Sequence, residues 1–481
     1  MQTITADQSI VGVLSSRHLV RCSCRLQLAS MSSRVRVLSV THVRPDDLPT
    51  ADHTADVKLS FFDALYVTMA PIQRLFFYES PDLPPFPALV RSLKSSLAAT
   101  LAVFPPLAGE ITHRPDSGGD VVIDCSAHAA VRFVEAEYSG VVDMRHLAAD
   151  DEHHAEEFVQ LVPEVEVGRL PAPVLAVQVT RPAGGGGVVA VGLSVHHAAA
   201  DGQSVWRFIK AWAAAAREGS PVAAPPPIFD RAVIRHPRAQ ELTRKFITNW
   251  TERMQVNPFP FPVPDMAHQR RRTFLLRADQ IQSLKQRMSQ SKITGTQQPP
   301  TTYVAVSSLV WASLVRAKAK SMDNDDDAYF LLSADCRRRL RPPVDEAYFG
   351  NCVMGCCARV AVGCLLRSGD DDGLAHAGAA IQRAMREGLE DPVADMEGRL
   401  ERRRGLPAER VTVIGSSNRF MGYETDFGWG APTRVELVSI TVGEEVTLLG
   451  AREGGVQVSV ALHRAHMEAL VDNFRLLSEA A

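Results

Sequence analysis

The chain has 481 residues, of which 46% are hydrophobic and 22% are charged, and its formal net charge is −3. This composition is typical of a globular protein, and the slightly acidic balance gives no overall electrostatic reason for nucleic-acid or membrane binding. No apolar stretch is long enough to span a bilayer. A chain of this length predicts two domains of ordinary size.

The first thirty residues differ in composition from the rest of the chain. They hold three arginines, several serines and one acidic residue, Asp7, which is typical of a transit peptide. The alternative, which we prefer, is a start codon upstream of a native start at Met31. We therefore treat residues 1–30 as an N-terminal extension that is disordered or not native.

Strands and helices alternate in the first half of the chain. Residues 88–103 predict a helix with leucines on one face, and Phe104-Pro105-Pro106 predicts its end. The apolar segments 175–180 and 188–195 predict two strands, and the glycines at 184–187 between them favour a hairpin.

A proline-rich stretch, residues 219–240, predicts a crossover linker between a domain at 31–218 and a second at 241–481. The mixture of strands and helices in both halves predicts an α/β protein of two layered domains with a crevice between them. The elements expected in the second half are a long apolar helix at 302–317, strands at 329–333, 353–362, 435–442, 446–449 and 456–462, and a final amphipathic helix at 467–477.

The most informative segment is His196-His197-Ala198-Ala199-Ala200-Asp201-Gly202, which joins the strand at 188–195 to a helical pattern. A histidine at the end of a strand can face a cleft and act as a general base on a hydroxyl. His197 and Asp201 give the spacing HxxxD. Taken alone, His197 fits equally a buried, hydrogen-bonded histidine without a chemical role.

A second motif, Asp426-Phe427-Gly428-Trp429-Gly430, lies in the second half. Two glycines around a tryptophan predict a tight turn that holds a large ring in a fixed place. The Asp-Phe-Gly triplet also occurs in protein kinases. The other kinase motifs are absent from the chain, which excludes that class.

Together, the HxxxD and DFGWG motifs resemble the signatures of the BAHD family of plant acyl-CoA-dependent acyltransferases. The segment Tyr348-Phe349-Gly350-Asn351-Cys352, preceded by Asp335-Cys336-Arg337, resembles the branch of phenolic glycoside and anthocyanin malonyltransferases. Leu59-Ser60-Phe61-Phe62-Asp63 and Phe104-Pro105-Pro106-Leu107-Ala108-Gly109 are also similar to family patterns. The resemblance extends from Met31 to the C-terminus.

The resemblance implies two α/β domains of the chloramphenicol-acetyltransferase type, with an active-site channel at their interface and His197 in its middle. Acyl-CoA would enter from one face and the acceptor alcohol from the other. His197 would take the proton of the acceptor hydroxyl while its oxygen attacks the thioester, and no acyl-enzyme is needed.

Asp201 and Asp426 each have two interpretations. Asp201 could orient the histidine as in a catalytic triad. The resemblance implies instead that it points away from the pocket and pairs with an arginine, for which Arg337 is a candidate, and its place at a helix start suits a cap. Asp426 is expected to shape the CoA channel, with a second acid or base as the minor alternative. We expect His196 to pack locally.

We expect no permanently bound cofactor and no metal. Cys352, Cys356 and Cys357 lack a paired CxxC or a histidine-rich partner and suit a strand of small, buried residues. The resemblance implies acyl-CoA as co-substrate, with malonyl-CoA favoured, and a phenolic or flavonoid glycoside as acceptor. We expect a cytoplasmic monomer that binds neither nucleic acid nor a membrane.

The phosphates of CoA require a local basic patch on a protein of net negative charge. Three arginine runs could supply it, at 270–272, 337–339 and 402–404. A malonyl carboxylate requires a further cation, for which Arg181 and Arg207 near the HxxxD segment are candidates.

Three other functions are open at this stage. Within the family, the donor could be an aromatic hydroxycinnamoyl-CoA. A peptide-synthetase condensation domain shares the HHxxxDG segment, although DFGWG and the lack of adjoining carrier sequence argue against it. A non-catalytic family member is the third alternative, and the intact His197 argues against it.

Overall fold

The structure is a computed structural model that describes residues 33–46, 56–115, 119–126, 129–153, 155–221, 225–256, 268–291, 299–367, 370–438 and 445–479. The expected N-terminal extension, residues 1–30, lies outside the described residues. The strands are β1 (Val35–Val43), β2 (Val57–Lys58), β3 (Ile72–Glu79), β4 (Glu110–Arg114), β5 (Asp120–Asp124), β6 (Val131–Tyr138), β7 (Glu152–His153), β8 (Ala172–Pro173), β9 (Leu175–Pro182), β10 (Val188–Val195), β11 (Gln269–Leu276), β12 (Asp327–Asp335), β13 (Val353–Ala361), β14 (Val411–Ile414), β15 (Arg434–Leu437), β16 (Glu445–Gly450) and β17 (Val456–His463). The α-helices are α2 (Phe61–Ala64), α3 (Phe86–Val103), α4 (Met144–Ala149), α5 (Ala155–Gln160), α6 (Gly202–Glu218), α7 (Ala239–Val256), α8 (Ala278–Gln290), α9 (Thr302–Ala317), α10 (Val362–Leu365), α11 (Asp370–Gly388), α12 (Met396–Arg404) and α13 (Arg464–Glu479).

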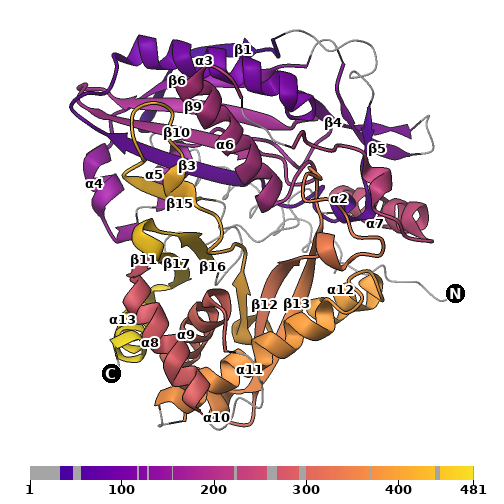
Figure 1. The fold of residues 1–481 in the computed structure, drawn as a ribbon, viewed down its shortest axis with the longest axis vertical. Helices are drawn as coiled ribbons and strands as arrows, with labels where there is room; N and C mark the ends of the chain where they lie inside the picture. Colours follow the sequence, from indigo (N-terminus) through magenta and orange to yellow (C-terminus); the bar gives the residue numbers. More distant parts are fainter. Residues whose placement is uncertain are drawn as a thin grey trace, which may run out of the picture.

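The first half of the chain builds a six-stranded sheet in the order β1-β6-β9-β10-β3-β15. Antiparallel pairing of β9 with β10 confirms the predicted hairpin. Helices α3 and α6 lie side by side over one face (Figure 1), and α4 and α5 pack on the other, so every residue of β10 is buried. At Gly192 a Cβ atom would lie 2.2 Å from the carbonyl oxygen of Leu161, so this close packing requires glycine.

The second half builds a seven-stranded sheet in the order β13-β12-β14-β16-β17-β11-β7. Helix α9 confirms the prediction for residues 302–317, and it is buried on nearly all sides because it packs against α8, α11 and α13. This long apolar helix and the sheet form a second hydrophobic core. A smaller sheet, β2-β5-β4-β8, lies in the first half.

The two large sheets exchange strands. β7 belongs to the first half by sequence but pairs with β11, and β15 belongs to the second half but pairs with β3. In Figure 1 the orange β15 lies beside the indigo β3. The sequence suggested that residues 435–442 continue a run of strands with their neighbours. Instead, the described part of this segment crosses to the first sheet, and residues 439–444 lie outside the description.

A buried ionic cluster lies at this exchange. The carboxylate of Glu436 on β15 is 2.7 Å from Nε of Arg434 and 3.2 Å from Nη2 of Arg271 on β11. Nε2 of His153 on β7 lies 3.6 Å from the same carboxylate. Burial raises the pKa of Glu436, but these three neighbours outweigh it and leave the pKa below its ordinary value. The charged carboxylate therefore ties both exchanged strands together.

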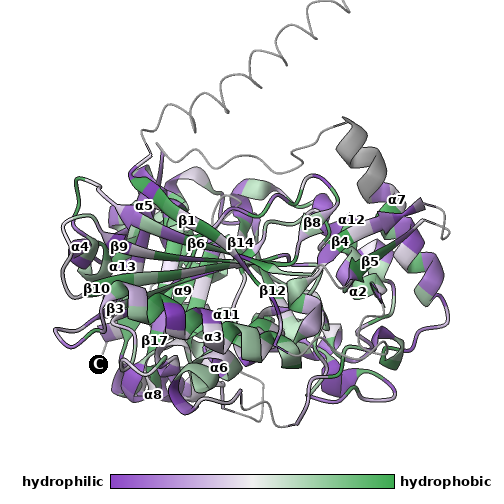
Figure 2. Cartoon of the chain, turned by 90° about the horizontal axis from the view of Figure 1, so that it is seen from above, coloured by the Kyte–Doolittle hydropathy of each residue, from purple (hydrophilic) through white to green (hydrophobic). Residues whose placement is uncertain are grey.

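Hydrophobic residues are concentrated in the interior strands, whereas hydrophilic residues lie on outward-facing helices such as α7 and α12 (Figure 2). Within the described ranges, none of the helices combines the length and the apolar character needed to cross a membrane.

Candidate active site

His197 lies in the turn between β10, which ends at Val195, and α6, which begins at Gly202. Its carbonyl oxygen accepts a hydrogen bond of 2.8 Å from Nδ2 of Asn351, which fixes the backbone of the turn. The pKa of His197 is lowered to about 4. Burial is the main cause and the charge of Arg74 adds to it, while the backbone of His197, Asp201 and Asn351 oppose the shift. The imidazole is therefore neutral at pH 7 and can accept a proton.

Tyr66 stacks on the His197 ring, with ring centroids 4.1 Å apart and planes inclined by 10°. Burial raises the pKa of Tyr66 above its ordinary value, so the phenol stays protonated. The sequence provided no signal for this contact, because Tyr66 belongs to none of the motifs and follows the short helix α2.

Tyr66 also lines a cavity of about 790 Å³. The chain segment from the end of α2 to Met69 forms one wall, and β12, β13, β14, α7, α11 and α12 form the others, so the cavity lies between the two halves of the chain. Much of the lining is apolar, and Arg399, Arg402, Arg403 and Arg404 add a basic side. The arrangement suits a ligand with an apolar body and an anionic group.

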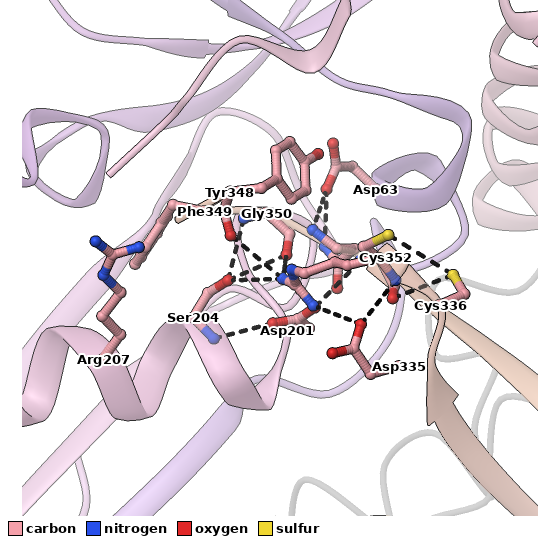
Figure 3. Close-up of polar contacts among 12 residues, drawn as sticks. Asp63, Asp201, Ser204, Arg207, Asp335, Cys336, Tyr348, Phe349, Gly350 and Cys352 are labelled. Carbon is pink, nitrogen blue, oxygen red and sulfur yellow. Dashed lines mark hydrogen bonds and ion pairs between the residues drawn. The ribbon is translucent and has the colours of Figure 1, made fainter. Parts of the chain in front are cut away.

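The carboxylate of Asp201 lies in a buried network of hydrogen bonds (Figure 3), and none of the hydrogen bonds it forms in the described residues goes to His197. One carboxylate oxygen caps α6 by accepting from the backbone N–H of Ser204 at 2.9 Å. The other accepts from Nη2 of Arg337 at 2.8 Å and from the backbone N–H of Cys352 at 3.1 Å. Arg337, the candidate partner, therefore pairs with Asp201, and the carboxylate has the geometry of a structural group.

A second buried carboxylate, Asp63, lies beside this network. Oδ2 of Asp63 is 3.0 Å from Nε of Arg231, and it also accepts from the backbone and hydroxyl of Ser60 in a capping box. Oδ1 accepts from both the backbone and the side-chain N–H of Asn351, at 3.0 and 2.9 Å. Asp63 thereby connects α2 to the segment that holds His197.

The segment Tyr348 to Cys352 runs between the two carboxylates. Arg337 donates to the carbonyl oxygen of Gly350 at 3.1 Å, and Arg231 donates to that of Phe349. The Tyr348 ring lies 5.4 Å from the guanidinium carbon of Arg231 and 5.6 Å from that of Arg337. The motif is therefore a strap that joins both ion pairs to the HxxxD turn.

Sequence reasoning missed the roles of Asp63 and Arg231. Asp63 lies in a segment recognised only as similar to the family, although Ser60 three residues before it is a capping-box signal. Arg231 lies in the expected linker, residues 219–240, where it is one of three arginines in a proline-rich stretch and nothing in the sequence marks it as buried. The linker instead contributes the counterion of Asp63.

The DFGWG motif forms a turn at the far end of α6. Oδ1 of Asp426 accepts from the backbone N–H groups of Gly428, Trp429 and Gly430 at 2.7, 3.0 and 2.9 Å. The two glycines have φ values of 98° and 89°, which other residues rarely adopt. Phe427 packs its ring on Trp212 at 4.8 Å, and the Trp429 ring lies 5.3 Å from Tyr78.

Asp426 lies too far from His197 to serve as its acid or base. Nη1 of Arg217, near the last residue of α6, donates to the Asp426 carbonyl oxygen at 3.4 Å. Since Asp201 caps the first turn of α6, a rise of 1.5 Å per residue places the two aspartates about 24 Å apart along the helix. The minor alternative of a second acid or base therefore has no geometric support.

The remaining candidates have other environments. His196 is fully buried, accepts from the backbone N–H of Ala198 at 3.2 Å, and has its pKa lowered by burial to about 3. Cys356 is buried and Cys357 is exposed, as expected for neighbours on the strand β13, and Cys352 is buried just before it. Among the described residues, no group of three metal-ligating side chains is positioned to hold an ion.

Residues 33–477 match the model of the Transferase family. The chain belongs to this family, the BAHD acyltransferases. It is therefore an acyl-CoA-dependent acyltransferase, as the two motifs suggested. The predicted mixed α/β fold of this family is also confirmed.

The relatives of this BAHD enzyme include malonyltransferases. It is 30% identical to phenolic glucoside malonyltransferase 1 of Bemisia tabaci, over 94% of the chain and 99% of that protein. It is 29% identical to malonyl-coenzyme:anthocyanin 5-O-glucoside-6'''-O-malonyltransferase of Salvia splendens, over 94% and 97%. The crystal structure of vinorine synthase has the same fold, with a TM-score of 0.70 at 21% identity, over 92% of the chain and all of that structure.

Because Asp201 forms a buried ion pair, we expect its substitution to lower the stability of the protein and to leave the catalytic base unaffected. In Asp201→Asn the helix cap remains, but Arg337 is left buried with only the partly exposed Asp335 as counterion. We expect the free energy of unfolding, measured by urea denaturation, to fall by about 3 kcal/mol. The folded fraction should keep the pH profile of the wild type. A changed profile would indicate an orienting carboxylate instead, and Asp335→Asn, the control, should cost less than about 1 kcal/mol.

The stack on His197 predicts that the ring of Tyr66 matters more than its hydroxyl. We expect Tyr66→Phe to retain kcat within about threefold and Tyr66→Leu to lower it about tenfold, because an aromatic pair contributes about 0.5–1.5 kcal/mol. Steady-state kinetics that separate kcat from KM measure both effects. Equal losses in the two variants would assign the role to the hydroxyl.

Proposed function

We propose that this acyltransferase moves a malonyl group from malonyl-CoA to a hydroxyl of a phenolic or flavonoid glycoside. The observation that supports it most is the neutral His197 in the HxxxD turn, stacked on a residue that lines a cavity between the two halves. The choice of donor and acceptor follows the relatives, which are named as malonyltransferases of phenolic glucosides and anthocyanins.

In the proposed reaction, His197 takes the proton of the acceptor hydroxyl as the oxygen attacks the thioester carbonyl carbon. The new C–O bond forms, the C–S bond breaks, and the CoA thiolate leaves. The imidazolium then returns its proton to the thiolate, so the enzyme regains its starting state. Nδ1 of His197 is buried in the protein, which leaves Nε2 as the nitrogen that meets the substrate.

The basic side of the cavity suits the phosphates or other anionic groups of a substrate. Arg402 pairs with Asp395 at 2.9 Å and Arg404 with Glu401 at 3.3 Å. The guanidinium of Arg403 bonds to no other residue in the described ranges. Of the three arginine runs, 402–404 is the one that lines this cavity, whereas Arg337 is committed to Asp201.

Two alternatives receive less support. An aromatic hydroxycinnamoyl donor would fit the apolar lining of the cavity, but its acyl group carries no free carboxylate that would pair with a further cation near His197. A non-catalytic member would have no need for a neutral, backbone-anchored His197.

A panel of acyl-CoA donors tests the proposal. We expect the highest kcat/KM with malonyl-CoA and a phenolic glucoside, and a loss of at least about 100-fold in His197→Ala because general-base catalysis contributes about 10²–10⁴. His196→Asn, its folding checked by circular dichroism, is the matched control and should retain turnover. Turnover with aromatic thioesters alone would refute the malonyl donor, and full activity of His197→Ala would refute the base.

The lowered pKa of His197 predicts the pH dependence. Above its pKa the ring is neutral and competent, and below it the imidazolium cannot accept a proton. We therefore expect kcat/KM to stay constant from pH 8 down to about 5 and to fall by one proton's slope near pH 4. Initial rates after a pH jump, with activity recovered on return to pH 7, separate this from unfolding. A midpoint near 6.5 would contradict a desolvated base.

A further inference from the structure

Arg74 is a buried guanidinium without a carboxylate partner in the described part of the chain. It lies on β3 and is 5% exposed. Nη1 donates to the carbonyl oxygen of Gln73 at 2.8 Å, Nε is buried without a partner, and no described residue bonds to Nη2. Burial lowers its pKa to about 9, against the opposing charge of Glu445. A buried arginine is normally paired, so this one requires an explanation.

The location of Arg74 connects it with His197. On the neighbouring strand β10, Leu193 lies opposite Arg74 and Val195 opposite Ile72, so the strand end that leads into His197 adjoins this part of β3. The guanidinium carbon lies 5.7 Å from the centre of the Trp206 ring, in the first turns of α6. Its positive charge is one of the influences that lower the pKa of His197.

The other arginines of this region are already engaged. Arg181 pairs with Glu137 at 2.7 Å and lies over the Phe86 ring. Arg207 donates to the carbonyl oxygens of Ala347 and Pro225, and in Figure 3 it points away from the buried network. The two candidates for a malonyl carboxylate are therefore held elsewhere.

Resting on the proposed function, we propose that Arg74 binds the free carboxylate of a dicarboxylic acyl group while the thioester carbonyl lies at His197. A carboxylate can accept two parallel hydrogen bonds from Nε and Nη2, the two nitrogens that lack a partner among the described residues. It supplies the counterion that the buried guanidinium lacks, whereas an acetyl group leaves the charge uncompensated. Arg74 is thus a specificity-determining residue for the donor.

The test compares malonyl-CoA, its neutral methyl ester and acetyl-CoA in the wild type and in Arg74→Met. Methionine keeps an apolar stem against Trp206 but removes the charge. We expect the ratio of kcat/KM for malonyl-CoA to that for acetyl-CoA to fall about 10- to 100-fold, the range for charge-assisted hydrogen bonds. The methyl ester should reproduce this loss in the wild type and cause no further loss in Arg74→Met.

Two further variants keep the test decisive. Arg74→Lys retains the charge without the planar fork, so we expect an intermediate ratio even if Arg74→Met folds poorly. Arg181→Met is the matched control and should leave the ratio unchanged. Calorimetric affinities for malonyl-CoA and acetyl-CoA give the same comparison without turnover.

An unchanged ratio and unchanged relative affinity in Arg74→Met overturn the assignment, as does an equal loss in Arg181→Met. A wild type that uses acetyl-CoA as well as malonyl-CoA also overturns it, while acyl transfer stands. A wild type that binds malonyl-CoA but turns over no thioester refutes the proposed function, and the affinities still decide the role of Arg74.

Discussion

The site depends on two carboxylates that are buried with their counterions, Asp63 with Arg231 and Asp201 with Arg337. Each carboxylate alone would be very costly to desolvate, and each arginine alone equally so. Together they are neutral, and the strap Tyr348 to Cys352 satisfies their remaining hydrogen bonds. The cluster joins α2, the HxxxD turn, the linker and the second half, so the position of His197 depends on all four.

This arrangement explains why, of the two polar residues of the HxxxD motif, only His197 is a candidate for catalysis. Asp201 uses both oxygens for the backbone of Ser204 and Cys352 and for Arg337, and none of its hydrogen bonds in the described residues goes to His197. His197 is instead oriented by the Tyr66 stack and by the hold of Asn351 on its carbonyl oxygen. Orientation by packing requires no carboxylate next to the base, and the ring stays neutral.

The sequence predicted elements whose signals are local and missed contacts whose partners are distant. The hairpin at 175–195, the helix at 302–317 and the role of Asp201 at a helix start follow from periodicity, glycine turns and capping chemistry. The pairing of β15 with β3 and the burial of Arg231 depend on residues far away in sequence. Local propensity carries no information about them, and a linker composition even argues against a buried charge.

The charge of Arg74 connects donor binding with the basicity of His197. Without substrate, burial and the charge of Arg74 both lower the pKa of His197, which makes the ring a weak base. If a donor carboxylate neutralises Arg74, one of these two effects is removed and the basicity of the ring rises. A dicarboxylic donor then strengthens the base that activates the acceptor, whereas acetyl-CoA leaves it weak. On the proposed role of Arg74, donor selection acts on the proton-transfer step as well as on binding.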